Sequence, residues 1–226
     1  MKQKTDLIVA LDVATRDNAE NIVRQLAPVV KIFKVGSQLF IALGPAAIEM
    51  VLRNKAKAFL DLKFHDIPNT VANASRVAVR LEVTMFTVHA QGGKEMMQAA
   101  LSGANDEAKK LKAKRPLIFG VTVLTSQEDR QAKIRVLELA RDVKESGLDG
   151  IVCSVQEAYS VRKAFGKDLL IMCPGIRLAG EKTLDQKRIA TPQQAKKSGA
   201  DFIVMGRSII NAKDPLRQAK RILKML

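Results

Sequence analysis

The sequence predicts a single-domain (β/α)8 barrel over residues 1–226. The first observation behind this prediction is a short apolar run, followed by a segment with helical spacing, that recurs eight times. The second is the chain length, which suits eight such units, and the third is the lack of a linker rich in Pro, Gly or Ser. A doubly wound open sheet also alternates strands and helices, but it more often has fewer strands, and its G-x-G-x-x-G fingerprint does not occur here.

The expected strands follow one another along the chain with helical segments between them. In order, they are residues 7–11, 32–35, 58–62, 85–88, 117–123, 150–153, 169–173 and 202–205. Each is a short, mostly apolar run of the kind that a buried strand carries. Between the runs, apolar residues recur three and four positions apart, as at Ile22, Leu26 and Val29, which predicts helices packed on the barrel.

Polar residues gather where these runs end, and in a (β/α)8 barrel the reacting groups lie at that end of the strands. In chain order they are Asp12, Lys34, Asp61, Lys63, Asp66, His89, Thr125, Ser126, Arg177 and Arg207, and Pro174 and Gly206 stand in the same strand-end segments. Any one of them alone is more often an ordinary strand-end group that reaches water. Together they predict an active site at one mouth of the barrel.

Strand alternation places several of these charges inside the barrel. Side chains two positions apart share a face, so Asp61 and Lys63 are expected to point into the mouth together. The same rule places Lys34 inside, and Asp12 with the even-numbered residues of the first run. Isolated charges in an enclosed mouth cost several kcal/mol, so we expect Asp12, Lys34, Asp61, Lys63 and Asp66 to neutralise one another in a ring.

A phosphate-binding end is expected after the eighth run. Gly206 and Arg207 lie where barrels commonly bind phosphate through backbone N–H groups at a helix start, and the Arg207 guanidinium suits phosphate oxygens. The polar connection over residues 175–191 is long, which predicts a lid over a ligand, with a plain surface excursion as the alternative. Within it, the Gln186 amide can donate to a phosphate and accept from a base.

Composition limits the partners. With 38 Lys and Arg against 23 Asp and Glu, the formal net charge of +15 favours an anionic partner, such as nucleic acid, a membrane surface or a phosphorylated small molecule. Aromatic residues make up only 4% of the chain and Trp is absent, so base stacking is not expected. The basic segments 109–115 and 213–224 carry no nucleic-acid motif, so nucleic acid is not expected as a partner.

Cysteine and histidine usage predicts neither a metal site nor a disulfide. Cys153 and Cys173 are far apart, and His65 and His89 stand in no metal-ligand spacing. Their pattern suits a reducing, cytoplasmic setting, and packing roles are as reasonable for the two histidines as catalytic ones. The first apolar run is too short for a signal peptide or a membrane span, so we expect no membrane association.

The segment Asp61-Leu-Lys-Phe-His-Asp-Ile-Pro68 resembles the D-x-K-x-x-D-I-P signature of the orotidine 5′-phosphate decarboxylase family. Seven further motifs occur in the family's order and cover essentially the whole chain. They are Ile8-Val-Ala-Leu-Asp12, Lys34-Val-Gly36, His89-Ala-Gln-Gly-Gly93, Val123-Leu-Thr-Ser126, Pro174-Gly-Ile-Arg177, Asp185-Gln-Lys-Arg188 and Gly206-Arg-Ser208.

This resemblance implies a homodimeric (β/α)8 barrel that converts orotidine 5′-phosphate to UMP and CO2. The reaction would be the last step of de novo pyrimidine synthesis and would need no metal or organic cofactor. By the same resemblance, Lys63 would protonate the ring carbon that loses CO2, and Asp61 would face the substrate carboxylate. Lys34 and Asp12 would hold the ribose hydroxyls and complete the charge network.

The resemblance also implies the remaining binding residues. Asp66 would reach into the partner subunit's site, with Thr70 also contributed across the dimer interface. Either Thr125 or Ser126 would contact the pyrimidine amide. The other substrate-binding positions would be Pro174, and, at the phosphate end, Arg177, Gln186, Gly206 and Arg207.

The chain departs from the family pattern in two places. It has Leu81-Glu-Val-Thr84 before the fourth strand, where Leu-Gly-Val-Asp is usual, and this departure falls at the expected end of the preceding helix. In the expected lid, Leu178 and Leu184 stand where Pro and Gly are more usual. Neither departure touches an expected catalytic group.

The main alternative is a metal-dependent sugar-phosphate decarboxylase or aldolase on the related barrel. Such enzymes resemble this chain in D-x-K-x-x-D, but they place a magnesium-binding carboxylate at the end of the second strand, where this chain has Lys34. A cation at that position argues against a metal. An aldolase that forms a Schiff base through Lys63 is disfavoured, because flanking carboxylates favour the ammonium over the neutral amine.

Overall fold

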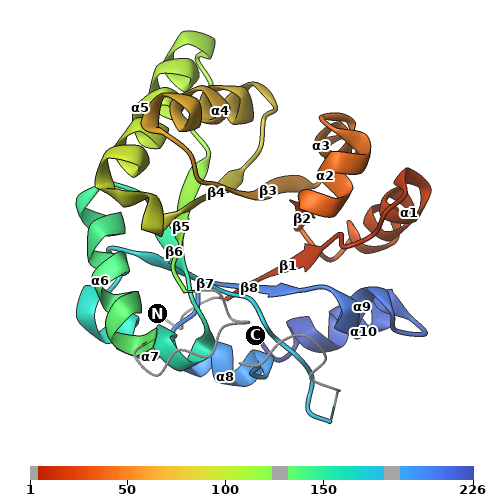
Figure 1. Ribbon diagram of the computed structural model, residues 1–226. Helices are drawn as coiled ribbons and strands as arrows, with labels where there is room; N and C mark the ends of the chain where they lie inside the picture. The colour runs from red at the N-terminus through yellow and green to blue at the C-terminus, as the bar shows by residue number, and fades with distance from the viewer. Residues whose placement is uncertain (1–4, 124–131, 181–188) are drawn as a thin grey trace.

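Eight parallel strands form the centre of the computed structural model, which describes residues 5–123, 132–180 and 189–226. Each strand pairs with the next, and β8 pairs back onto β1, so the sheet is a closed barrel (Figure 1). The prediction of a (β/α)8 barrel is confirmed, and the open doubly wound sheet is excluded by the pairing of β8 with β1. None of the helices in the described ranges has both the length and the apolar character needed to cross a membrane.

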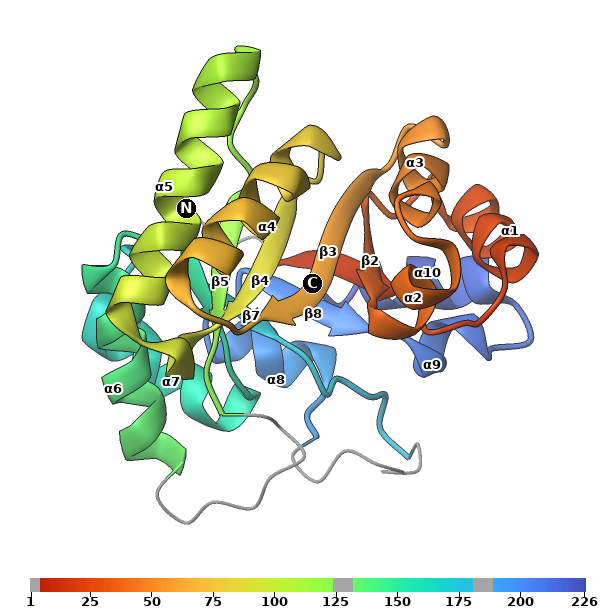
Figure 2. The same ribbon diagram turned by 45° about the horizontal axis from the view of Figure 1, so that its top comes forward.

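The strands alternate with helices that surround the barrel (Figures 1 and 2). The strands are β1 (Asp6–Ala10), β2 (Ile32–Gly36), β3 (Lys57–Phe64), β4 (Met85–His89), β5 (Leu117–Val121), β6 (Gly150–Val152), β7 (Leu170–Cys173) and β8 (Phe202–Met205). The helices are α1 (Arg16–Leu26), α2 (Ser37–Leu43), α3 (Ala46–Arg53), α4 (Pro68–Arg80), the short η1 (Ala90–Gly92), α5 (Gly93–Leu111), α6 (Ala132–Glu145), α7 (Val155–Phe165), α8 (Pro192–Lys197), α9 (Arg207–Ile210) and α10 (Pro215–Leu223).

Strand alternation divides the core into two clusters, as predicted. Ile8 and Ala10 belong to the cluster inside the barrel, whereas Leu7 and Val9 belong to the larger cluster between the strands and the helices. The inner cluster consists of Ile8, Ala10, Ile32, Phe59, Met85, Phe119, Met172 and Val204, packed with four partly buried neighbours. Because these side chains fill the barrel, a ligand has room only at its ends.

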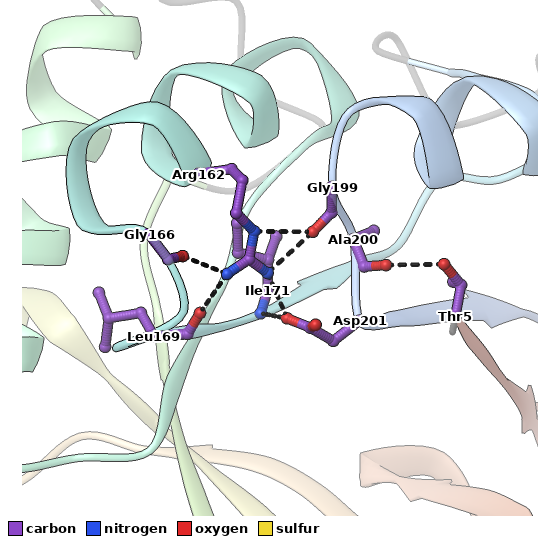
Figure 3. A network of polar contacts seen from close by, with 8 residues as sticks. All are labelled: Thr5, Arg162, Gly166, Leu169, Ile171, Gly199, Ala200 and Asp201. Atoms are coloured by element: carbon purple, nitrogen blue, oxygen red, sulfur yellow. Dashed lines mark hydrogen bonds and ion pairs between the residues drawn. The ribbon is translucent and has the colours of Figure 1, made fainter. Parts of the chain in front are cut away.

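A network of hydrogen bonds ties the strands together at the end where they begin (Figure 3). The carboxylate of Asp201, directly before β8, accepts a hydrogen bond from the Ile171 N–H in β7 (2.8 Å) and pairs with Arg162 of α7 (2.5 Å). The Arg162 guanidinium also donates to the carbonyls of Gly199 (2.9 Å) and Leu169 (3.1 Å). One arginine thereby supplies donors to the backbone of two loops, one before β7 and one before β8.

The same arrangement recurs one strand pair earlier. The Asp149 carboxylate, directly before β6, accepts from the Ile118 N–H in β5 (2.8 Å), and Arg115 donates to both of its oxygens at 2.7 Å. In both cases an aspartate at the start of one strand holds the backbone of the preceding strand. The two aspartates thus help to set the pairing of β5 with β6 and of β7 with β8.

We predict that Arg162→Leu lowers the free energy of unfolding by about 2–4 kcal/mol, because it leaves the partly buried Asp201 carboxylate and several carbonyls without their donor. Chemical denaturation measures this change. Lys163→Leu is the matched control, since Lys163 is the exposed next residue of the same helix and its loss is expected to change stability by less than about 0.5 kcal/mol. Equal effects of the two substitutions would contradict the role given to Arg162.

Glu82, which stands where the family usually has glycine, has a strained backbone conformation just after helix α4. Helix α4 ends at Arg80, and the Glu82 N–H bonds to the Val79 carbonyl (2.9 Å). Glu82 has φ +55°, in the left-handed region that a glycine adopts without a steric penalty. The glycine that is usual at this position therefore suits the observed backbone better than glutamate does.

Glu82→Gly is expected to stabilise the protein by about 0.5–1 kcal/mol, because it relieves the left-handed strain at an exposed position. Thermal and chemical denaturation test this. Glu82→Ala removes the same charge but keeps Cβ, so it is expected to give no such gain. A gain of the same size from alanine would show that charge, and not backbone conformation, is responsible.

Candidate active site

A cavity of about 280 Å³ lies at the end of the barrel where the strands finish. Its floor is apolar and includes Phe59, Met172 and Val204 of the inner cluster. Its wall carries eight of the residues that the sequence singled out, namely Asp12, Lys34, Asp61, Lys63, Pro174, Arg177, Gly206 and Arg207. The predicted gathering of these residues at one mouth is confirmed, whereas their individual roles stay predictions.

Four charged side chains of alternating sign form a chain from the loop after β1, across β2, to β3. The Lys34 ammonium lies 3.2 Å from Asp12 Oδ1 and 3.4 Å from Asp61 Oδ2. The Lys63 ammonium lies 2.9 Å from Asp61 Oδ1. The two inner members are the more buried, with side-chain exposures of 12% for Lys34 and 13% for Asp61. Each buried charge therefore has a direct partner of opposite sign, as the desolvation argument requires.

Asp66 does not take part in this network, contrary to the expectation of a five-membered ring. Strand β3 ends at Phe64, so the alternation that points Asp61 and Lys63 inward no longer applies two residues later. Asp66 is exposed, and its carboxylate accepts a hydrogen bond from the N–H of its own neighbour Ile67 (2.7 Å).

Gly36 leaves room for the Lys34 ammonium between its two carboxylate partners. A Cβ atom at Gly36, two residues further along β2 and on the same face, would lie only 2.8 Å from the Lys34 ammonium nitrogen. A side chain at residue 36 would thus displace the ammonium from between Asp12 and Asp61. This steric restriction explains the glycine in the motif Lys34-Val-Gly36, which strand alternation alone does not.

Lys63 has a distorted backbone that brings its amine to Asp61. It has φ +53°, a conformation that costs a non-glycine residue about 1–2 kcal/mol. The pairing of β3 with β4 shifts register between Leu60 and Phe64, so Lys63 lies in a bulge. The hydroxyl of Thr87 in β4 accepts a hydrogen bond from the Lys63 N–H at 3.0 Å and donates one to Asp61 Oδ1, also at 3.0 Å.

Sequence reasoning missed Thr87. The residue stands inside an apolar run, and its parity with His89 was the only signal that it faces the barrel interior. It is almost completely buried, at 1% exposure. Its hydroxyl contacts both residues of the signature that carry the expected chemistry.

The Asp61 carboxyl is held in its ionised form. Burial is the largest single influence and raises its pKa, but the charges of Lys34 and Lys63 and the hydrogen bonds from Lys63 and Thr87 lower it. Together they outweigh burial, so the pKa of Asp61 lies below its ordinary value. A negative charge is therefore present in the mouth throughout the physiological pH range.

The two histidines form a stacked pair beside this network. The rings of His65 and His89 lie 5.1 Å apart at an angle of 22°, and His89 Nδ1 accepts a hydrogen bond from the Gln91 N–H (3.4 Å). Burial, followed by the charges of His65 and Lys63, lowers the pKa of His89, which favours its neutral form. Neither ring is among the described residues that line the cavity, an arrangement that suits packing roles.

The other side of the cavity carries two guanidinium groups. Pro174 and Arg177 follow β7, and Gly206 and Arg207 follow β8, with Arg207 opening the short helix α9. Arg177 is only 7% exposed and donates to the Ile176 carbonyl (2.9 Å). Since β8 lies next to β1, this basic side adjoins Asp12, and a Cβ at Gly206 would approach Asp12 Oδ2 to 3.2 Å. A side chain at residue 206 would therefore press on the Asp12 carboxylate.

Of the other five residues to which the resemblance assigns a role, the structure describes two. Asp66 and Thr70 are exposed and are not among the described residues that line the cavity. Thr125, Ser126 and Gln186 lie outside the residues that the structure describes.

Comparisons with known proteins agree with the geometry. Residues 5–222 match the model of the family described as "Orotidine 5'-phosphate decarboxylase / HUMPS family". The chain is 46% identical to the orotidine 5′-phosphate decarboxylase of Syntrophomonas wolfei, over 99% of this chain and 98% of that protein. It is 44% identical to the enzyme of the same name from Moorella thermoacetica, over 98% of this chain and 92% of that protein.

Solved structures show the same likeness. The crystal structure of orotidine 5′-phosphate decarboxylase from Lactobacillus acidophilus superposes with a TM-score of 0.85 at 35% identity, covering 98% of this chain and 99% of that one. An uncharacterized conserved protein from Geobacillus kaustophilus superposes with a TM-score of 0.84 at 35% identity, covering 97% of this chain and 99% of that one. With a family match over nearly its whole length and relatives above 40% identity, this chain belongs to the orotidine 5′-phosphate decarboxylase / HUMPS family.

Proposed function

We propose that this protein decarboxylates orotidine 5′-phosphate to UMP and CO2, the step that forms UMP in pyrimidine biosynthesis. The observation that carries the proposal is the ion-paired Lys63, whose ammonium lies 2.9 Å from the buried carboxylate of Asp61 in a cavity with two arginines on its other side. The names of the curated relatives support the same reaction.

The cavity suits a substrate with a phosphate at one end and a carboxylate at the other. Arg177 and Arg207 provide donors for the phosphate oxygens, and Gly206 lets the backbone come close. Asp12 and Lys34 lie between this side and Lys63, where the ribose hydroxyls of a bound nucleotide would reach them. The pyrimidine ring then lies over Asp61 and Lys63.

The reaction breaks the bond between the ring carbon and the carboxylate and leaves the electron pair on that carbon. The Lys63 ammonium stabilises this negative charge and then transfers a proton to it, so that an N–H bond breaks as the new C–H bond forms. The amine regains its proton from solvent, since the Lys63 side chain is 39% exposed. Lys63 thereby acts as both the electrostatic stabiliser and the general acid.

Asp61 contributes through repulsion. Its carboxylate, held ionised by its neighbours, faces the carboxylate of the bound substrate, and departure of neutral CO2 relieves this repulsion. Binding of the phosphate by the arginines opposes the repulsion and keeps the substrate in place. The binding energy of a remote group thus serves the reacting carbon.

The metal-dependent alternative conflicts with the position of Lys34. Its ammonium lies between the carboxylates of Asp12 and Asp61, 3.2 Å and 3.4 Å away, and so occupies the place where a divalent cation would bind them. The mouth therefore carries a fixed organic cation in place of a metal. This arrangement favours decarboxylation of orotidine 5′-phosphate over metal-assisted sugar-phosphate chemistry.

The ultraviolet absorption band of orotidine 5′-phosphate is expected to disappear when pure protein treated with EDTA is added, because the substrate is decarboxylated without a metal. Lys63→Ala is expected to stay folded and to lower kcat by at least about 10³-fold, because the reaction loses both its stabilising cation and its proton donor. The matched control is Lys57→Ala, at the exposed opposite end of the same strand, with unchanged kcat expected.

Three results would contradict this proposal in different ways. An unchanged absorption band with the natural protein would exclude the reaction. Decarboxylation only after magnesium is added back would favour the metal-dependent alternative. Near-normal turnover by Lys63→Ala would remove Lys63 from the chemistry.

We also propose that the protein is a homodimer in which Asp66 and Thr70 serve the partner subunit's site. Both residues are exposed at the mouth side of β3 and α4 and do not line the cavity of their own chain, within its described residues. Val77, which is 47% exposed, lies on the same face of α4 as Thr70, seven residues further along, and Ile67, which is 66% exposed, directly precedes the helix. Exposed apolar side chains beside two polar groups suit a contact with a second copy.

Mixing two inactive variants tests this arrangement. If Asp66 acts across the interface, Lys63→Ala mixed with Asp66→Asn is expected to regain about a quarter of the natural activity, because half of the dimers are mixed and each holds one intact site. If Asp66 acts in its own chain, both sites of every mixed dimer lack a residue and no activity returns. The control is Lys63→Ala mixed with the double variant Lys63→Ala/Asp66→Asn, which contains no intact site in either case.

We propose the cytoplasm as the compartment of this protein. Cys153 and Cys173 form no disulfide, and both are buried, at 1% and 0% exposure. Thiols that form no disulfide suit a reducing compartment.

A further inference from the structure

Thr87 is a buried residue whose hydroxyl makes two hydrogen bonds, both to the residues of the proposed chemistry. It accepts from the Lys63 N–H (3.0 Å) and donates to Asp61 Oδ1 (3.0 Å). A hydroxyl has one proton to donate and lone pairs to accept with, so these two bonds are compatible. We propose that Thr87 is a positioning residue that holds the Lys63 backbone and the Asp61 carboxylate in the geometry needed for proton transfer; this inference rests on the proposed function.

The register of the sheet gives Thr87 this role. Leu60 pairs with Phe86 and Phe64 pairs with Val88, so the three residues 61–63 of β3 lie opposite Thr87 alone. The bulge removes Lys63 from the regular ladder, and its N–H needs another acceptor. The Thr87 hydroxyl is that acceptor, and it thereby stabilises a left-handed backbone at Lys63 that is otherwise unfavourable.

The second hydrogen bond orients the carboxylate. Rotation about the last side-chain bond of an aspartate is soft, so its two oxygens need partners to hold them in place. Thr87 donates to Oδ1, the oxygen that also contacts the Lys63 ammonium, while Oδ2 faces Lys34. One hydroxyl therefore restrains the backbone of Lys63 and, through Asp61, the position of its amine.

A nearby threonine shows what a structural hydroxyl in this barrel looks like. Thr122, directly after β5, is also fully buried, and its hydroxyl donates to the Val152 carbonyl at 2.7 Å. That bond joins two neighbouring backbone segments and involves neither Asp61 nor Lys63. Thr122→Val is therefore a control for the general cost of removing a buried hydroxyl.

The test compares Thr87→Val, Thr87→Ser and Thr122→Val. Valine keeps the branched shape of threonine without the hydroxyl, so Thr87→Val is expected to lower kcat by about 10- to 100-fold while KM changes less than about threefold. Serine restores the hydroxyl, and Thr87→Ser is expected to keep kcat within about threefold of the natural protein. Thr122→Val is expected to lose stability but to keep its kcat.

The proposal is overturned if Thr87→Val turns over normally or if Thr87→Ser is as slow as Thr87→Val. It is also overturned if Thr122→Val loses kcat equally, since any buried hydroxyl would then have the same effect. A loss confined to KM would likewise oppose it, because the role proposed concerns the reacting groups and not the capture of substrate.

A second measurement separates this inference from the proposed function. The pH titration of the Asp61 carboxyl carbon, followed by NMR in the protein without substrate, reports on the hydrogen bond directly. Loss of a donor destabilises the carboxylate, so Thr87→Val is expected to raise the pKa of Asp61, while Thr122→Val leaves it unchanged. An unchanged titration in Thr87→Val overturns the positioning role whether or not the natural protein decarboxylates orotidine 5′-phosphate, and absence of that activity alone overturns only the proposed function.

Discussion

The buried carboxylate of Asp61 is the group on which the mouth of this barrel depends. Burial alone disfavours its charge, and it stays ionised only because Lys34, Lys63 and Thr87 surround it. The dependence also runs the other way, since without Asp61 the two ammonium groups would face each other across an apolar floor with no anion between them. The four charges therefore form one unit, in which the loss of any member removes at least one ion pair of its neighbours and alters their position.

Both ends of the barrel carry aspartates paired with basic side chains, but arginines are the partners at one end and lysines at the other. Where the strands begin, Asp149 and Asp201 pair with arginines whose planar guanidinium groups also reach backbone carbonyls or a second carboxylate oxygen. Such multiply bonded groups hold strands together and have little capacity left for a ligand. Where the strands end, Asp61 pairs with two lysines, each of which presents a single ammonium with three rotatable donors. A lysine can keep one bond to Asp61 and turn another toward a substrate, and it can also give up a proton, which arginine does not do.

Much of the fold and part of the site follow from the sequence because they depend on simple periodicities. Eight apolar runs predict the barrel, and alternation along β3 predicts that Asp61 and Lys63 point inward. The same rule fails at Asp66, because the strand ends two residues before it. It does not reveal Thr87 or the steric role of Gly36 either, since both depend on where neighbouring strands lie and on a bulge that gives Lys63 a left-handed backbone. Local pattern thus predicts which residues meet, whereas the exact contacts depend on register between strands.

Only a small part of the net charge of +15 lies at the cavity. Four cations and two carboxylates line it within the described residues, which leaves two positive charges in excess. Asp12 and Asp61 lie against the lysines, so the excess falls mainly on the side of Arg177 and Arg207, where the proposed reaction places the phosphate. The reacting end is close to neutral by itself, and in the proposed reaction it gains a negative charge when the substrate carboxylate enters beside Asp61. In this proposal the arginines attract the phosphate, which does not react, and Asp61 repels the carboxylate, which leaves as CO2. This division lets tight binding of the phosphate raise the reaction rate and does not merely stabilise the bound substrate.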